Sequence, residues 1–296
     1  METKKLTIKD SALSFLIGFL LCQLSVVVAS CFCLIFFKLV NYDMENYSVF
    51  FSTAIGYMIL SLTLYTAMLL VFIFFKRKKE DKITKPINVK KLLLYILISA
   101  ASFFALYPII VCVDSLLSKC GVKLSTLSYD LTTKNYFISL ISLVIAPAVC
   151  EELLFRGIIF SGLKKHGKIF SITITALMFS IFHMSISQTV YPLLMGLLLS
   201  VIMFYEQNIY YCIAVHITNN FLSLTLSYFK INLVFSHWSY IVLAIILAIA
   251  FICTILFFII KNHKSYEKQK LTKTELIYLL VSLSIMILFW ILTNLQ

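Results

Sequence analysis

The chain has 296 residues, of which 61% are hydrophobic and only 13% are charged, and its mean hydropathy is +0.99. Soluble domains are about half apolar with about a quarter of their residues charged, so this composition excludes a soluble globular protein and indicates a polytopic membrane protein. The net charge of +12 arises mainly from lysine-rich connections between apolar runs, which favours contact with anionic lipid and argues against a nucleic-acid partner.

Nine apolar runs predict an all-α, polytopic transmembrane bundle, because a membrane span takes about 20 residues. The fifth and sixth runs are short. Either both belong to longer helices that are tilted in the membrane, or one is only partly embedded, so we expect eight or nine spans. The runs lie near residues 12–37, 48–75, 92–113, 136–160, 169–185, 189–205, 209–229, 239–260 and 276–294.

The positions of Lys and Arg predict the orientation of these helices. With the N-terminus inside the cell, nineteen basic residues fall on the inner side and five on the outer side. Cytoplasmic connections carry the excess of Lys and Arg, so we expect a multi-pass cell-membrane protein with a cytoplasmic N-terminus. The five outer residues are Lys38, Lys119, Lys123, Lys134 and Lys230.

The fourth run contains three charges within six residues, Glu151, Glu152 and Arg156. Each charge near the bilayer centre costs roughly 3 kcal/mol, so this cluster predicts a functional site. Glu152 and Arg156 share a helix face at i, i+4 and are expected to pair. Glu151 points ~100° away and has Phe155 at i+4, so it has no local counter-ion and suits the role of general base. Pro147, four residues earlier, is expected to loosen the helix. The alternative is a structural clasp to a neighbouring helix.

Two later runs supply histidines with neighbours on the same helix face. Phe179 precedes His183 by four residues, and Asn220 follows His216 by four. A lone histidine on an apolar helix usually packs in the core, but two of them near an unpaired glutamate favour a catalytic site. We therefore expect Glu151, His183, His216 and Asn220 to converge on one cavity.

Because the embedded charges and histidines fall in the middle of the chain, we expect three parts. Residues 1–135 form N-terminal transmembrane helices, residues 136–229 form the catalytic membrane core, and residues 230–296 form C-terminal transmembrane helices.

The motifs Glu-Glu-x-x-x-Arg, Phe-x-x-x-His and His-x-x-x-Asn, in this order and each on its own run, resemble those of the CAAX protease and bacteriocin-processing family. That family consists of intramembrane glutamic endopeptidases and includes the type II CAAX prenyl proteases. Ala146-Pro147 before the first motif and a small residue pair at Gly196 and Ser200 agree with it, although the family more often has a second glycine at the place of Ser200. The resemblance covers about residues 136–225.

The resemblance implies an endopeptidase that hydrolyses a peptide bond of a membrane-associated or lipidated peptide or protein, without a cofactor or metal. Glu151 would activate a water, and His183 would hold this water and move its proton. His216 and Asn220 would stabilise the oxyanion. The implied partners are this substrate and the membrane lipids. The residues implied to support the site are Glu152, Arg156 and Phe179.

Two alternatives stay open at the level of the sequence. A glutamate and two histidines could bind zinc as a His₂Glu site with an open position, although no H-E-x-x-H helix occurs. The same groups could line an ion path in a non-enzymatic transporter or bacteriocin-immunity protein, although the sequence shows no sign of the inverted repeats common in transporters.

Overall fold

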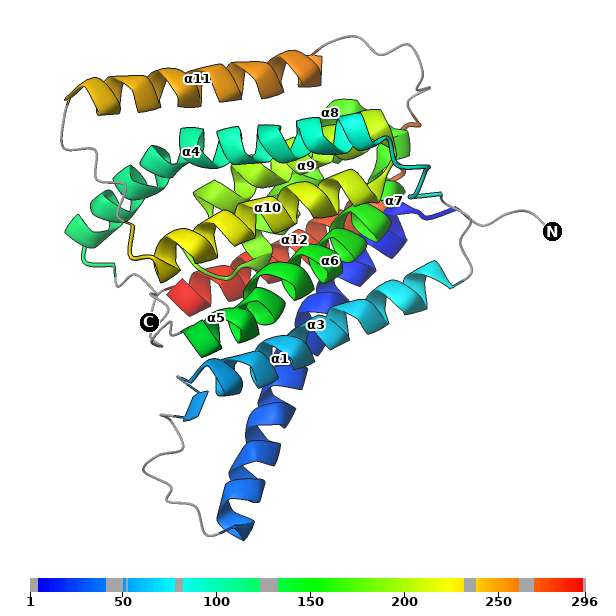
Figure 1. The fold of residues 1–296 in the computed structure, drawn as a ribbon. Helices are drawn as coiled ribbons and strands as arrows, with labels where there is room; N and C mark the ends of the chain where they lie inside the picture. Colours follow the sequence, from blue (N-terminus) through cyan, green and yellow to red (C-terminus); the bar gives the residue numbers. More distant parts are fainter. Residues whose placement is uncertain are drawn as a thin grey trace.

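The computed structural model describes residues 5–40, 50–51, 53–77, 82–122, 133–231, 238–260 and 269–294. Within these ranges the chain is helical and contains no strand (Figure 1), and each of the nine apolar runs becomes a helix. The α-helices are α1 (Ile8–Leu39), α3 (Ala54–Lys76), α4 (Val89–Lys119), α5 (Thr133–Ser139), α6 (Ala146–Glu152), α7 (Ser161–Leu163), α8 (Lys168–Phe182), α9 (Val190–Glu206), α10 (Ile209–Tyr228), α11 (Trp238–Ile260) and α12 (Lys273–Asn294).

The predicted all-α transmembrane bundle is confirmed. Among the described residues, five helices are long and apolar enough to cross a membrane, and three shorter apolar helices accompany them. The count of eight or nine spans therefore stays a prediction. The five long helices are Ile8–Leu39, Ala54–Lys76, Val89–Lys119, Asn135–His166 and Lys273–Asn294.

The helix that carries the charged cluster changes its winding before the two glutamates and again directly after them, in the stretch that contains Arg156. It is π-helical at Leu140–Ile145 and again at Leu153–Phe160, with α6 between them. Pro147 in α6 has no N–H to donate, so the loosening expected from it coincides with the first π-helical stretch. Such π-turns are frequent at functional sites, and the two glutamates end α6.

The helices between residues 133 and 231 form the centre of the bundle (Figure 1). Helices α1, α3 and α12 cover one side of it, and α4 and α11 cover the other. Helices α8 and α9 approach closely at Gly196, where a Cβ atom would lie 3.1 Å from the Cα atom of Ala176. Five of the described helices begin at a Thr or Asn that accepts a backbone N–H from the first turn, namely Thr7, Thr53, Asn88, Asn208 and Thr272.

Helix α4 extends furthest beyond its predicted run. The third apolar run was expected to end at residue 113, but α4 continues to Lys119 because Leu116 and Leu117 extend the apolar pattern beyond Asp114. The N–H of Cys120 caps the helix by donating to the carbonyl oxygens of its last turn. Asp114 therefore lies on a helix and not in a connection.

The two ends of the bundle differ in charge. At one end, here called the basic end, Lys91 pairs with Glu206 at 2.8 Å and the N–H of Gln269 donates to Lys165. The opposite end is marked by the hydrogen bond from the N–H of Ile186 to Asn294. The described basic residues of the basic end are Lys5, Lys9, Lys76, Arg77, Lys82, Lys85, Lys90, Lys91, Lys164, Lys165, Lys168, Lys270 and Lys273, whereas those of the opposite end are Lys38, Lys119, Lys134 and Lys230.

Candidate active site

A cavity of about 550 Å³ lies between α3, α4, α6, α9, α10 and the end of α8. Glu151, His183, His216 and Asn220 all line it, as expected from the embedded polar side chains. The polar side chains of the three motifs thus come from three separate helical segments and meet in one space.

Glu152 and Arg156 form the expected ion pair. Both side chains are completely buried, and the Arg156 guanidinium lies 2.8 Å from Oε1 of Glu152. The guanidinium also donates to the carbonyl oxygen of Gly196 at 3.1 Å and lies over the ring of Phe179, with 4.7 Å from Cζ to the ring centroid. A buried charge needs a partner and further hydrogen bonds, and this arrangement supplies both.

His216 contacts both glutamates. Its Nδ1 atom lies 2.9 Å from Oε1 of Glu152, and its Nε2 atom lies 3.9 Å from Oε2 of Glu151. Because an ionised carboxylate only accepts, Nδ1 carries the proton that it donates to Glu152. In a neutral imidazole Nε2 then has no proton, so only the imidazolium form could donate from Nε2 to an oxyanion. The sequence did not predict this contact.

Glu151 is the carboxylate without a local partner. Its Oε2 atom is buried and makes no hydrogen bond to any described residue, and the side chain is 13% exposed. The 3.9 Å separation from Nε2 of His216 is too long for a direct hydrogen bond, and a water can bridge two polar atoms at such a separation.

His183 follows α8 directly and faces the cavity. Its Nδ1 atom lies 2.8 Å from the carbonyl oxygen of Phe179. A carbonyl oxygen accepts only, so Nδ1 carries the proton, and Nε2 of a neutral His183 is a proton acceptor. The ring of Phe179 packs edge-on against both histidines, with centroids 5.0 Å from His183 and 5.9 Å from His216.

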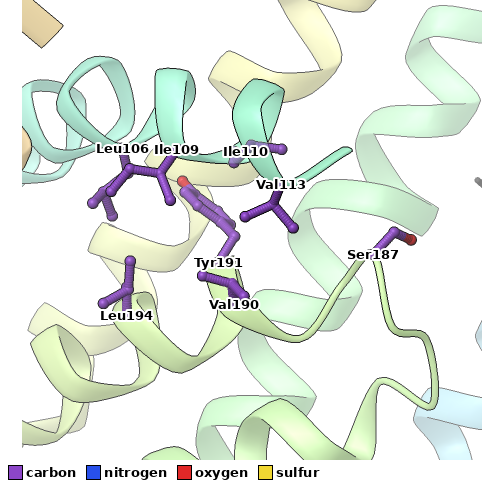
Figure 2. Close-up of a pocket in the computed structure, with 8 residues that line it drawn as sticks. All are labelled: Leu106, Ile109, Ile110, Val113, Ser187, Val190, Tyr191 and Leu194. Carbon is purple, nitrogen blue, oxygen red and sulfur yellow. The ribbon is translucent and has the colours of Figure 1, made fainter. Parts of the chain in front are cut away.

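Asn220 is oriented by two residues that the sequence reasoning missed. The side-chain amide of Asn219 donates to Oδ1 of Asn220 at 3.2 Å, and the Tyr191 hydroxyl donates to Oδ1 of Asn219. The NH₂ group of Asn220 remains available as a donor. Figure 2 shows Tyr191 on α9 with its ring extending toward Leu106 and Ile109 of α4. In the sequence, the adjacency of Asn219 to Asn220 was the feature that could have indicated this contact.

Helices α3 and α4 also contribute polar groups to the cavity, in addition to the residues of the three motifs. Tyr57 and Tyr65 of α3, and Tyr107 and Asp114 of α4, line its walls. The spacings of eight and seven residues place each pair on one helix face, which was the signal in the sequence.

The contacts of the cavity side chains bear on the zinc alternative. In the part of the chain that the structure describes, no three His, Cys, Asp or Glu side chains gather in an arrangement that could hold a metal ion. Oε1 of Glu152 already accepts from both Arg156 and His216, and Nδ1 of His183 donates to the backbone.

Comparison with known proteins finds one similarity, and it covers this site. Residues 133–222 match the family model described as type II CAAX prenyl endopeptidase Rce1-like. Curated proteins and solved structures yielded no match. The matched range contains all three motifs and the helical segments on which the cavity histidines and glutamates lie.

The expected division of the chain at residues 135 and 229 stays a prediction, since the match bears on the central part only. The resemblance inferred from the three motifs is confirmed. Residues 133–222 of this multi-pass membrane protein are thus similar to the type II CAAX prenyl endopeptidases, a family of membrane peptide hydrolases.

Proposed function

We propose that the protein is an intramembrane endopeptidase in which Glu151 activates a water for attack on a peptide bond of a membrane-associated peptide or protein. One observation carries the proposal. Oε2 of Glu151 is buried and has no hydrogen-bond partner among the described residues, yet it lines the same cavity as two histidines and an asparagine amide.

The water is held between Oε2 of Glu151 and Nε2 of His216. Glu151 takes one proton from the water as the resulting hydroxide attacks the carbonyl carbon of the substrate, which is the role of a general base. The carbonyl oxygen becomes an oxyanion, and the NH₂ group of Asn220 donates a hydrogen bond to it.

The tetrahedral intermediate then collapses, and the C–N bond breaks. Glu151 returns its proton to the leaving amine nitrogen, and the former carbonyl oxygen becomes part of a carboxyl group. Nε2 of His183 accepts the remaining proton as that group ionises. Water has then been added across the bond. His183 passes its proton to the departing amine or to solvent, so that both Glu151 and His183 return to their starting states.

Glu152 is a positioning residue in this proposal. Its Oε1 atom accepts from both Arg156 and His216, and its side chain is completely buried, so it is not placed to take a proton from the water. Instead it fixes the tautomer and the orientation of His216. This arrangement parallels the way in which a carboxylate orients the histidine of other hydrolytic sites.

The test compares membrane peptides from cells that carry the wild-type protein with those from cells that carry Glu151→Gln. Peptides produced only in the wild-type cells identify the cleaved bond, and the purified protein in proteoliposomes must then cut a synthetic peptide at the same bond. Glu206→Gln is the matched control, because Glu206 pairs with Lys91 at the basic end, away from the cavity. Identical peptides from Glu151→Gln and wild-type cells would contradict the proposal and favour a non-enzymatic role.

A further inference from the structure

We infer that the cavity is reached from the end of the bundle opposite to the basic end, so that the substrate is the extracytoplasmic part of a membrane-anchored or exported peptide. That a peptide is cleaved in this cavity rests on the proposed function. The access itself rests on the shape of the cavity, the packing of the bundle and the charge at its two ends.

The cavity extends from the middle of the bundle toward the opposite end. On α10 its lining begins at His216 and continues to Ser227, and on α4 it continues to Asp114. A second pocket of about 400 Å³ shares lining residues with the cavity and reaches Lys230 and Ile231, just beyond the end of α10. The two pockets share Phe103, Tyr107, Ser223 and Ser227, so together they lead from the site to this end.

The lining becomes more exposed along this path and includes polar side chains up to its outer end. At the inner end, the side chains of His216 and Glu151 are only 8% and 13% exposed. At the outer end, Gln188, Ser227 and Lys230 are all exposed. Polar groups are unfavourable in contact with lipid tails, so this mouth opens to water or headgroups.

The half of the core nearer the basic end is filled. Each central helical segment places fully buried side chains between the site and that end, and protein interiors of this kind leave few voids larger than a water molecule. None of these side chains lines the cavity. Examples from the four central segments are Phe160, Leu163, Ile172, Phe204 and Cys212.

The distribution of basic residues assigns the two ends to the two sides of the membrane. In Figure 1, α10 runs from the basic end at the right to the opposite end at the left. Thirteen described Lys and Arg residues lie at the basic end and four at the other. The excess marks the cytoplasmic side, which places the mouth of the cavity outside. A lipidated tail in the cytoplasmic leaflet would meet the filled half of the core.

Labelling of engineered thiols tests the access without any need for activity. Ser227→Cys places a thiol at the mouth, and Lys270→Cys places one at the exposed basic end. Both are made in a background in which the exposed native cysteines are replaced by Ser, namely Cys31, Cys112, Cys120 and Cys253. We expect a membrane-impermeant maleimide to label Ser227→Cys on intact spheroplasts, and to label Lys270→Cys only in inverted vesicles. Labelling with the reverse sidedness overturns the inference.

A second variant, Ser223→Cys, reports on the interior of the path and supports the result if one of the variants folds poorly. We expect labelling from outside, more slowly than at Ser227→Cys. Labelling of Ser223→Cys only from the cytoplasmic side also overturns the inference.

A cleavage assay tests the access in a second way. A peptide found by comparing wild-type and Glu151→Gln cells is added to sealed vesicles of each orientation. We expect cleavage in right-side-out vesicles and at least tenfold less in inverted vesicles until they are permeabilised. Cleavage confined to inverted vesicles overturns the inference. If neither vesicle orientation shows cleavage but the thiols are labelled from outside, the proposed peptidase function is wrong and the outward access is still supported.

Discussion

Nδ1 of His216 lies 2.9 Å from the same Glu152 oxygen that holds the guanidinium of Arg156. One buried atom therefore belongs both to the ion pair that neutralises charge inside the membrane and to the cavity that contains Glu151. Any change that displaces this oxygen alters stability and site geometry together. For this reason, each variant below is measured for unfolding as well as for cleavage.

Replacement of Glu151 separates chemistry from folding. Glu151→Gln keeps the size of the side chain and removes the proton acceptor, so we expect a folded protein whose cleavage rate falls by roughly 10²–10⁴. Thermal unfolding in detergent should match the wild type, since no described residue donates a hydrogen bond to Oε2. An active Glu151→Gln variant would reverse the assignment of the two glutamates.

Removal of Arg156 should damage stability. Arg156→Ala leaves the buried carboxylate of Glu152 without its cation, and breaking a buried pair in this way costs about 3–5 kcal/mol. The matched control is Lys91→Ala, which breaks an ion pair whose lysine is half exposed and should have a much smaller effect on unfolding. Equal unfolding free energies for the two variants would show that the buried pair contributes little.

Asn220 should affect turnover more than binding. Loss of an oxyanion donor lowers the rate by roughly 10²–10³, so we expect Asn220→Ala to reduce kcat by this factor at a nearly unchanged KM. Tyr191→Phe removes the hydroxyl that orients Asn219. The loss of one neutral hydrogen bond costs about 1 kcal/mol, so we expect kcat to fall about fivefold. If Asn220→Ala instead abolishes binding and spares turnover, the amide grips the peptide and does not hold the oxyanion.

The contact between α8 and α9 should depend on Gly196. A Cβ atom there would lie 3.1 Å from the Cα atom of Ala176 and would also shift the carbonyl oxygen that accepts from Arg156. We expect Gly196→Ala to lower stability by about 1–3 kcal/mol, as overpacking of a core does. Ser200→Ala, one turn away, should be neutral, because the buried Ser200 hydroxyl has no hydrogen-bond partner among the described residues. The comparison uses thermal unfolding of both variants in the same detergent.

Chelation distinguishes a glutamate mechanism from a zinc mechanism. With no three-ligand cluster among the described residues, we expect cleavage to persist in a strong chelator and to show no stimulation by added zinc. Loss of cleavage that returns with a stoichiometric amount of zinc would support the His₂Glu alternative. Glu151→Gln in the same assay gives the inactive baseline.

Local features of the fold and the site could be predicted from the sequence. The nine apolar runs became helices, because hydropathy and length alone select transmembrane segments. The pairing of Glu152 with Arg156 follows from the i, i+4 geometry of one helix. The convergence of the three motifs was also expected, although no spacing rule fixes how their helices cross.

Relationships between helices could not be predicted in the same way. The contact of His216 with Glu152 joins residues 64 positions apart, and it decides which ring nitrogen carries the proton. The chain of Tyr191, Asn219 and Asn220 likewise needs two helices in register. The predicted third run ended directly before Asp114, because a charged residue ordinarily ends an apolar run. A helix that lines a cavity with polar groups can instead continue through a charged residue, as α4 does.

The shortness of α8 has a consequence for the supply of water. Its 15 residues span about 22 Å at 1.5 Å per residue, whereas a hydrocarbon core is about 30 Å thick. This hydrophobic mismatch must be met by a locally thinner bilayer or by a helix end that stops below the surface. In both cases the polar turn with Ser185, Ser187 and Gln188 brings hydration down to the level of His183, and a hydrolytic reaction inside a membrane requires such a path for its second reactant.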